Sequence, residues 1–118
     1  MSTIVVCDDE AAIRFAVSEI LSERGHDVRE ASSADHALDR LDGADVLITD
    51  LAMSGKDGME LLREVRARDP QLPVIVITGR HSESVRDTAL AQGCVAYMVK
   101  PFSGTELIDA IRRAQAAG

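Results

Sequence analysis

Four short hydrophobic runs in this chain each end at a side chain that can bind a metal ion or a phosphate. These side chains are two adjacent aspartates, a third aspartate, a threonine and a lysine: Asp8, Asp9, Asp50, Thr78 and Lys100. Carboxylates are ligands for a divalent cation, and a cation, a lysine and a hydroxyl can together stabilise the charge on a transferring phosphoryl group. A carboxylate can also act as the nucleophile and form an aspartyl-phosphate.

The four runs have the composition of buried β-strands, and they cover residues 3–7, 46–49, 74–77 and 95–99. Runs of Val and Ile without polar alternation are typical of a parallel sheet whose two faces are both covered. Ligands of such sheets bind just beyond the carboxyl ends of the strands. We therefore expect the five polar side chains to lie together at one rim of a sheet.

Helix-like segments alternate with the strands along the whole chain, as in βαβ units. The expected helices cover residues 11–24, 34–41, 58–68, 84–92 and a last segment that begins near residue 103. A fifth and more charged strand at residues 27–31 fits the edge of a sheet. These elements predict an α/β fold with a doubly wound, five-stranded parallel sheet and helices on both faces.

The last two helices differ in how firmly the sequence anchors them. The last helix has a capping box and a hydrophobic staple, formed by Ser103 with Glu106 and by Phe102 with Leu107. The fourth helix has three plausible apolar anchors, Val85, Ala89 and Leu90. So little apolar area would hold it weakly, which suits either a segment that moves or a marginal surface helix.

The composition restricts the class of protein. The 118 residues fit one domain, and five strands and five helices use them up, so no effector domain is expected. A formal net charge of -7 argues against sequence-independent binding of nucleic acid. No apolar run approaches the roughly 18 residues of a membrane span, and the start of the chain lacks the basic region of a signal peptide. We expect a soluble, cytoplasmic protein.

The two cysteines, Cys7 and Cys94, lie far apart in the sequence and lack the spacing of a metal site. In a cytoplasmic protein they are expected to be reduced and to serve as packing residues. The alternative is a redox-active thiol at Cys7, because this residue lies beside the acidic pair.

Three carboxylates at one rim repel one another unless a cation neutralises them. Mg²⁺ suits such a site because it prefers oxygen ligands and keeps waters and phosphate oxygens in its shell, whereas no loop here offers the dense ligand set of Ca²⁺. Each residue alone has a plainer interpretation. Asp9 could cap a helix, Lys100 could be a surface charge and Thr78 a strand residue. Their joint occurrence at the strand ends favours a site.

Over its whole length, residues 1–118, the chain resembles the receiver domain of two-component response regulators. The matching motifs follow the first, third, fourth and fifth predicted strands and open one helix: Asp8-Asp9-Glu10, Asp50-x-x-Met53, Thr78-Gly79, Lys100-Pro101-Phe102 and, at the helix, Asp57-Gly58. Each motif alone is weak, but the set in this order is specific. The resemblance implies the flavodoxin-like strand order 2-1-3-4-5.

The resemblance also implies a chemistry for the strand ends. A partner histidine kinase or histidine phosphotransfer protein would phosphorylate Asp50. Asp9, Asp50 and the backbone carbonyl of Ala52 would bind Mg²⁺, and Asp8 would assist through water. Lys100 would contact the phosphoryl group. The protein would catalyse only its own phosphorylation and dephosphorylation, and would not be an enzyme with an external substrate.

A switch that follows phosphorylation is implied in the same way. Thr78 would move to hydrogen-bond the phosphoryl group, and Tyr97 would turn inward behind it. From the residues alone, the favoured interpretation of Tyr97 is an aromatic of the fifth strand that packs on the sheet. The resemblance also implies a cis Lys100–Pro101 bond and an unknown downstream protein bound by the fourth helix, fifth strand and fifth helix. The protein would be a monomer or a weak, phosphorylation-dependent dimer.

The chain departs from the family pattern at one position, and two further positions beside the phosphorylation site are ones that vary within the family. Ser54 stands where the family usually has proline. Ala52 and Arg80 occupy two variable positions beside the phosphorylation site, which often set how easily water reaches the phosphoryl group. We hypothesise that Arg80 approaches the aspartyl-phosphate and changes its lifetime; the alternative is an exposed loop arginine. His81 follows in the same loop.

Three other functions are alternatives to a stand-alone phosphorylation switch. A phosphatase of the haloacid dehalogenase type needs a second aspartate two residues after the first, where this chain has Ala52. A flavodoxin-like cofactor binder needs a phosphate-binding loop after the first strand, where Asp8, Asp9 and Glu10 would repel phosphate. An adaptor that binds its partner without phosphorylation remains open.

Overall fold

The computed structural model describes residues 2–53 and 55–117. This part of the chain contains five strands and five helices in strict alternation: β1 (Thr3–Cys7), α1 (Ala11–Glu23), β2 (Asp27–Ala31), α2 (Ala34–Leu38), β3 (Val46–Asp50), α3 (Gly58–Arg68), β4 (Val74–Thr78), α4 (Glu83–Ala91), β5 (Ala96–Val99) and α5 (Gly104–Ala117). In this part of the chain no helix has both the length and the hydrophobicity needed to cross a bilayer.

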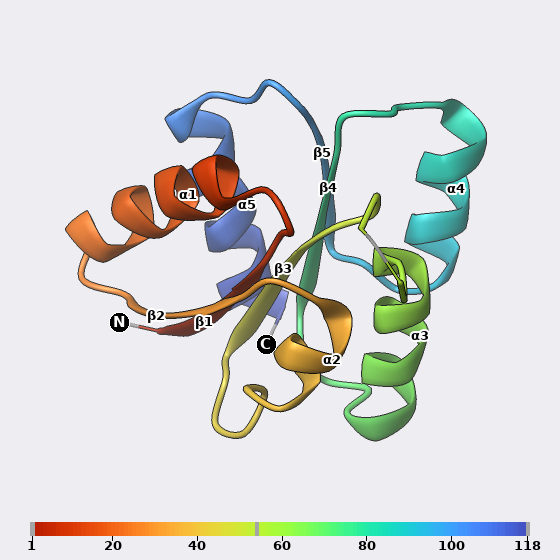
Figure 1. Cartoon of the computed structure of the whole chain (residues 1–118), viewed down its shortest axis with the longest axis horizontal. Coiled ribbons are helices and arrows are strands. Elements are labelled where there is room, and N and C mark those ends of the chain that lie inside the picture. The colour runs from red at the N-terminus through yellow and green to blue at the C-terminus, as the bar shows by residue number, and fades with distance from the viewer. Residues whose placement is uncertain (1, 54, 118) are drawn as a thin grey trace.

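The strands form one parallel sheet in the order β2-β1-β3-β4-β5, with α1 and α5 on one face and α2, α3 and α4 on the other (Figure 1). The predicted fold class and strand order are therefore confirmed. The register places Asp50 of β3 beside Ile77 of β4. Two of the predicted polar residues, Asp50 and Thr78, occupy the last position of a strand rather than the position after it. The ladder hydrogen bonds therefore hold the backbone of both residues.

The charged strand β2 lies at the edge of the sheet, as its sequence predicts. It pairs with β1 alone, and most of its residues are partly exposed. The position of β2 at the edge explains why this strand is charged, because one side of an edge strand is not covered by another strand. The Glu30 carboxylate of this strand forms an ion pair with Arg14 of α1.

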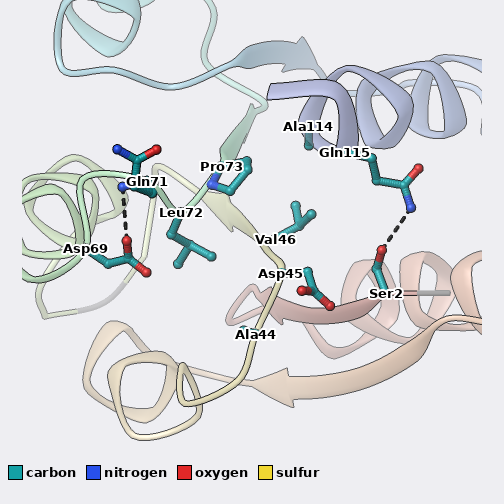
Figure 2. A pocket seen from close by; sticks show the side chains of 10 residues that line it. All are labelled: Ser2, Ala44, Asp45, Val46, Asp69, Gln71, Leu72, Pro73, Ala114 and Gln115. Atoms are coloured by element: carbon teal, nitrogen blue, oxygen red, sulfur yellow. Dashed lines mark hydrogen bonds between the residues drawn. The ribbon is translucent and has the colours of Figure 1, made fainter. Parts of the chain in front are cut away.

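At the amino ends of the strands, opposite the predicted site, the surface has a hollow of about 430 Å³ (Figure 2). Two carboxylates line it, and both already accept backbone hydrogen bonds. Asp45 accepts from the Thr3 N–H at 2.8 Å, and Asp69 accepts from the Gln71 N–H at 3.0 Å. These bonds hold the loops that enter β3 and β4, so this rim has a structural explanation.

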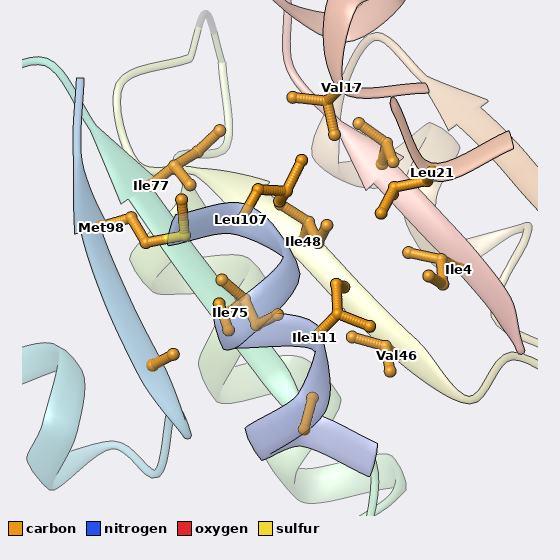
Figure 3. Close-up of a cluster of buried hydrophobic side chains, with 14 of the residues drawn as sticks. Ile4, Val17, Leu21, Val46, Ile48, Ile75, Ile77, Met98, Leu107 and Ile111 are labelled. Atoms are coloured by element: carbon orange, nitrogen blue, oxygen red, sulfur yellow. The ribbon is translucent and has the colours of Figure 1, made fainter. Parts of the chain in front are cut away.

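The two faces of the sheet carry separate aliphatic cores. Side chains alternate along each strand, so that in β1 Ile4 and Val6 enter one core while Val5 and Cys7 enter the other. Figure 3 shows the first core, in which Leu107 and the next turn of α5 lie over β3, β4 and β5. Burial of each large aliphatic side chain stabilises the fold by roughly 1.5–3 kcal/mol. Two cores on one central sheet make the strand ends a rigid base for a site.

Helix α2 is shorter than predicted, because it ends at Leu38 rather than at residue 41. Ser33 caps its start by accepting a hydrogen bond from the His36 N–H. Beyond its end, the carbonyls of Arg40 and Asp42 accept hydrogen bonds from the Arg29 guanidinium of β2. This tertiary contact replaces the last predicted turn of the helix.

The last two helices begin with side-chain caps. In α5 the capping box is confirmed, since Ser103 Oγ accepts from the Glu106 N–H at 3.1 Å and Glu106 Oε1 accepts from the Ser103 N–H at 3.3 Å. Ser82 caps α4. The expectation that Leu90 anchors α4 is wrong, because this side chain is 42% exposed and Ala89 is the buried residue of the helix. Helix α4 is therefore held even more weakly than its sequence suggests.

Candidate functional site

The five predicted side chains meet at the carboxyl ends of β1, β3, β4 and β5, and we call them the strand-end cluster: Asp8, Asp9, Asp50, Thr78 and Lys100. Carboxylate oxygens from the three aspartates lie within 4.8 Å of one another. Asp8 is fully buried and Asp50 is 2% exposed, whereas Asp9 is exposed on the turn that enters α1. The cluster thus combines two buried carboxylates with one at the surface.

Lys100 connects the carboxylates. Its Nζ donates to Asp50 Oδ2 at 2.9 Å and to Asp8 Oδ2 at 3.1 Å, and it lies 3.4 Å from Glu10 Oε1. Burial by itself would lower the pKa of the Lys100 amine, but the hydrogen bonds and charges of Asp50 and Asp8 outweigh burial and raise the pKa to about 12. The amine therefore remains protonated throughout the neutral range.

The surroundings of Asp8 disfavour its ionised form. Burial raises the pKa of its carboxyl, and the charge of Asp50 raises it further. Hydrogen bonds from the Glu10 N–H and from Lys100 act in the opposite direction but do not cancel the rise. Burial and the Asp50 charge thus outweigh the hydrogen bonds and charge of Lys100 at this carboxyl, and a bound cation would favour its ionised form.

Thr78 lies at the end of β4 and is buried. Its Oγ1 accepts a hydrogen bond from the Arg80 N–H at 3.0 Å, and its carbonyl accepts from the Lys100 N–H at 2.8 Å. The Arg80 side chain is exposed. A hollow of about 220 Å³ opens between the β3–α3 and β4–α4 loops, and Ala52, Thr78 and Arg80 are among the residues that line it. The two variable positions therefore face the same opening.

Tyr97 of β5 is half-buried and contacts the β4–α4 loop. Its hydroxyl lies 3.1 Å from His81 Nδ1, and the two rings are tilted with centroids 5.6 Å apart. Burial raises the pKa of the Tyr97 hydroxyl, so the side chain stays neutral near pH 7. The sequence placed His81 in this loop without assigning it a partner. The contact joins the tyrosine to the loop that follows Thr78.

Comparisons with known proteins agree with this geometry. The response regulator receiver domain family matches residues 4–112. The chain belongs to this family. Its sequence is 38% identical over 111 residues to the transcriptional regulatory protein TrcR of Mycobacterium tuberculosis, covering 92% of this chain and 43% of TrcR. It is also 38% identical over 118 residues to the DNA-binding transcriptional regulator NtrC of Rhizobium meliloti, covering 98% of this chain and 24% of NtrC.

Solved structures give the same family. The receiver domain protein of Clostridium thermocellum superimposes with a TM-score of 0.93 at 32% identity, covering 98% of this chain and 95% of that one. The receiver domain of NtrX from Brucella abortus superimposes with a TM-score of 0.92 at 34% identity, covering 98% and 99% of the two chains. Because this receiver domain spans less than half the length of TrcR and NtrC, the activities of those whole proteins do not transfer to it.

Receiver domains are phosphoacceptor switches that generally bind Mg²⁺ at an acidic pocket, and the donor set here fits that ion. Three carboxylates supply oxygen ligands at one rim, where burial first and the Asp50 charge second raise the pKa of Asp8. The Ala52 N–H donates to Asp50 Oδ1 at 3.1 Å, so the loop that carries the Ala52 carbonyl lies against the Asp50 carboxylate. The Lys100–Pro101 bond is cis, as the resemblance implies.

The two cysteines of this receiver domain are buried and free. Burial and, to a smaller extent, the nearby carboxylates raise the pKa of the Cys7 thiol to about 11, although a Thr49 hydrogen bond lowers it. The thiol donates to the Ser33 carbonyl at 3.3 Å. A protonated, hydrogen-bonded thiol supports the packing interpretation of Cys7 over the redox alternative.

The sequence left three contributors to this receiver site without a role. Glu10 is a further carboxylate near Lys100, and Gly58 packs against the Asp50 backbone. Arg14 reaches the Asp8 carbonyl from α1. The sequence could have indicated a role for Arg14, because this residue falls on the same helical face as Val17 and Leu21, which are both buried. A charge on a buried face needs a partner. The departure at Ser54 lies outside the described residues.

Proposed function

We propose that this receiver domain is a phosphorylation switch in which Asp50 accepts a phosphoryl group from a histidine kinase or a histidine phosphotransfer protein. One observation carries the proposal. A nearly buried carboxylate at a strand end is held 2.9 Å from a protonated lysine and shares a metal-binding geometry with two further carboxylates. This arrangement supplies a nucleophile, a cation site and a fixed positive charge for one reaction.

The transfer is an in-line displacement at phosphorus. A carboxylate oxygen of Asp50 forms the new O–P bond while the P–N bond to the donor histidine breaks, and the released imidazole keeps the electron pair and takes up a proton. Asp50 is oriented beforehand, because Oδ1 accepts from the Ala52 N–H and Oδ2 accepts from Lys100. Lys100 stays protonated and stabilises the charge of the phosphoryl oxygens.

Mg²⁺ would be held by Asp9, Asp50 and the Ala52 carbonyl, with Asp8 acting through water. When bound, it would neutralise phosphoryl charge that repels the carboxylates. Lys100 cannot do this alone, since Asp8 and Asp50 already share its amine. Two sources of positive charge therefore have separate roles in the proposed reaction.

Phosphorylation would act on the β4–α4 loop. The product places a phosphoryl group of about -1.5 to -2 charge near the Thr78 hydroxyl, which can donate a hydrogen bond to it, while the Asp50 carboxylate gives up its own negative charge. Movement of Thr78 would strain its bond from the Arg80 N–H, and inward rotation of Tyr97 would break its contact with His81 in the same loop. Because α4 follows this loop and buries little apolar area, it would shift at low cost. Output would pass to a protein bound at α4, β5 and α5.

The proposal is tested by phosphorylation with a small acyl phosphate. We expect Mg²⁺-dependent incorporation of one phosphoryl group, found by intact mass and located by mass spectrometry in the peptide that contains Asp50. Chelation of Mg²⁺ should slow incorporation by about 100-fold, the usual order for loss of one electrostatic stabiliser. Mapping to another residue, or incorporation unaffected by the chelator, would contradict the proposal. Absence of incorporation beside a phosphorylated control receiver would favour the adaptor.

Arg80 is proposed to protect the phosphorylated state. Its side chain borders the hollow that leads to Thr78, so its guanidinium can pair with the phosphoryl group and exclude water. Such a pair near the surface is worth about 0.5–1 kcal/mol, so Arg80→Ala should speed dephosphorylation by about two- to fivefold. The decay of the phosphorylated form measures this directly. Arg63→Ala, at an exposed position of α3, is the control. An unchanged decay rate in Arg80→Ala would reject the role.

A further inference from the structure

We infer that Arg14 is a positioning residue, which holds the Asp8–Asp9 turn in the geometry that binds the cation. The inference rests on the Mg²⁺ site of the proposed function. Arg14 lies in the first turns of α1, and its side chain is 14% exposed. Its Nη1 donates to the backbone carbonyl of Asp8 at 2.8 Å, and its Nε donates to Glu30 Oε1 at 3.1 Å.

The contact acts on one peptide group. The Asp8 carbonyl belongs to the peptide that joins Asp8 to Asp9, so its direction sets where the backbone of Asp9 begins. The Asp8 N–H donates to the Ala31 carbonyl of β2, and this bond extends the sheet by one residue. Beyond that point the chain leaves the ladder. Arg14 fixes the first peptide group after the hydrogen bonds of the sheet, which joins Asp8 to Asp9. The orientation of this peptide group determines where the exposed Asp9 carboxylate lies.

Glu30 aims the guanidinium. It is a residue of β2, which pairs with β1 directly. Arg14 therefore joins the start of α1, the end of β1 and the edge strand, three elements whose relative positions define the turn. Planar guanidinium groups suit this role, because two of their N–H groups point in fixed directions to different acceptors.

The charge of Arg14 and its hydrogen bond to the Asp8 carbonyl have opposite expected effects on cation affinity, so a binding measurement distinguishes between them. A positive charge near a cation site weakens cation binding, so loss of the charge alone would tighten it. Loss of the bond to the Asp8 carbonyl would loosen the turn and weaken binding. The ion pair with Glu30 compensates much of the charge, so we expect the positioning effect to dominate.

The experiment is a Mg²⁺ titration of the unphosphorylated protein by calorimetry or by amide chemical shifts. Arg14→Ala should raise the Kd for Mg²⁺ by about tenfold, the lower range for loss of an outer-shell partner. Arg14→Lys, which keeps the charge but not the two-directional fork, should also raise it. Arg24→Ala, an exposed arginine at the end of the same helix, should leave the Kd unchanged. Saturating Mg²⁺ should restore the phosphorylation rate of Arg14→Ala.

The outcomes separate the two claims. Mg²⁺ bound equally or more tightly by both Arg14→Ala and Arg14→Lys would overturn the positioning role while leaving the proposed function intact. A wild-type protein that does not bind Mg²⁺ would overturn the proposed function itself. If Arg14→Ala does not fold, Arg14→Lys decides the matter, because it keeps the long side chain and the charge. A Kd that rises in Arg14→Lys supports the role.

Discussion

Asp50→Asn should abolish phosphorylation by the acyl phosphate. An amide oxygen carries no negative charge, so it is a poor nucleophile and a weaker ligand for Mg²⁺. Removal of a nucleophile commonly costs 1000-fold or more, and we expect a loss of at least about this size. Intact mass after incubation with the phosphodonor and Mg²⁺ measures it, with the peptide that contains Asp50 as the site to inspect.

The loss should not come from unfolding. Asp50→Asn removes one charge from a crowded cluster, in which burial and the Asp50 charge raise the pKa of Asp8. A carboxyl whose folded pKa is raised destabilises the fold fully at pH values above that pKa, and the destabilisation is lost as the pH falls from the folded pKa to the pKa of the unfolded chain. Without the Asp50 charge, the Asp8 pKa should fall. The fall in the Asp8 pKa should raise the free energy of unfolding at neutral pH, and loss of the Lys100 contact with Asp50 should lower it. We therefore expect this free energy to be retained or increased.

Asp57→Asn provides the matched control. Asp57 lies in the same β3–α3 connection and caps α3 by accepting from the Glu60 N–H at 2.9 Å. Asparagine caps helices about as well as aspartate, so phosphorylation and stability should both be kept. Undiminished phosphorylation of Asp50→Asn would require another acceptor and would remove Asp50 from the proposed chemistry.

Gly58→Ala should be the most destabilising of the substitutions considered, and it should also disturb the acceptor. A Cβ at Gly58 would lie 2.1 Å from the Asp50 carbonyl oxygen and 2.8 Å from Leu51 Cα. Both neighbours are backbone atoms, and the Gly58 N–H donates to the Leu51 carbonyl at 3.0 Å, so neither side can yield without moving the end of β3. We expect a loss of about 3 kcal/mol in the free energy of unfolding, the upper range for overpacking.

Chemical denaturation measures this loss, and the phosphorylation rate of the folded variant measures the displacement of Asp50. Gly104→Ala is the control, because its Cβ would meet Ile20 Cδ1 at 4.0 Å, an ordinary contact, near the start of α5. Alanine is the better helix former, so this variant should be neutral or slightly more stable. An unchanged denaturant concentration at the midpoint of unfolding in Gly58→Ala would contradict the close packing of α3 on the Asp50 backbone.

The local sequence was sufficient for the elements and for the chemistry of the strand ends. Runs of Val and Ile predicted the strands, helical periodicity predicted α1 and α3 within one residue, and Ser103 with Glu106 predicted the start of α5. These signals act within a few residues of the chain, so no knowledge of the fold is needed to detect them. They fail where distant groups intervene, as when Arg29 takes the carbonyls after α2.

The strand-end pattern predicted which polar residues would meet, but the tertiary structure alone decided how they are held. Lys100 lies between Asp8 and Asp50, which are far from it in sequence. Arg14 on Asp8 and Gly58 against Asp50 likewise depend on the sheet register and on how each helix packs. Hydrogen bonds and close contacts fall off within an ångström or two, so they are determined only when the whole domain is assembled. The sequence determined which chemistry is present at the rim, and the packed fold decided its geometry.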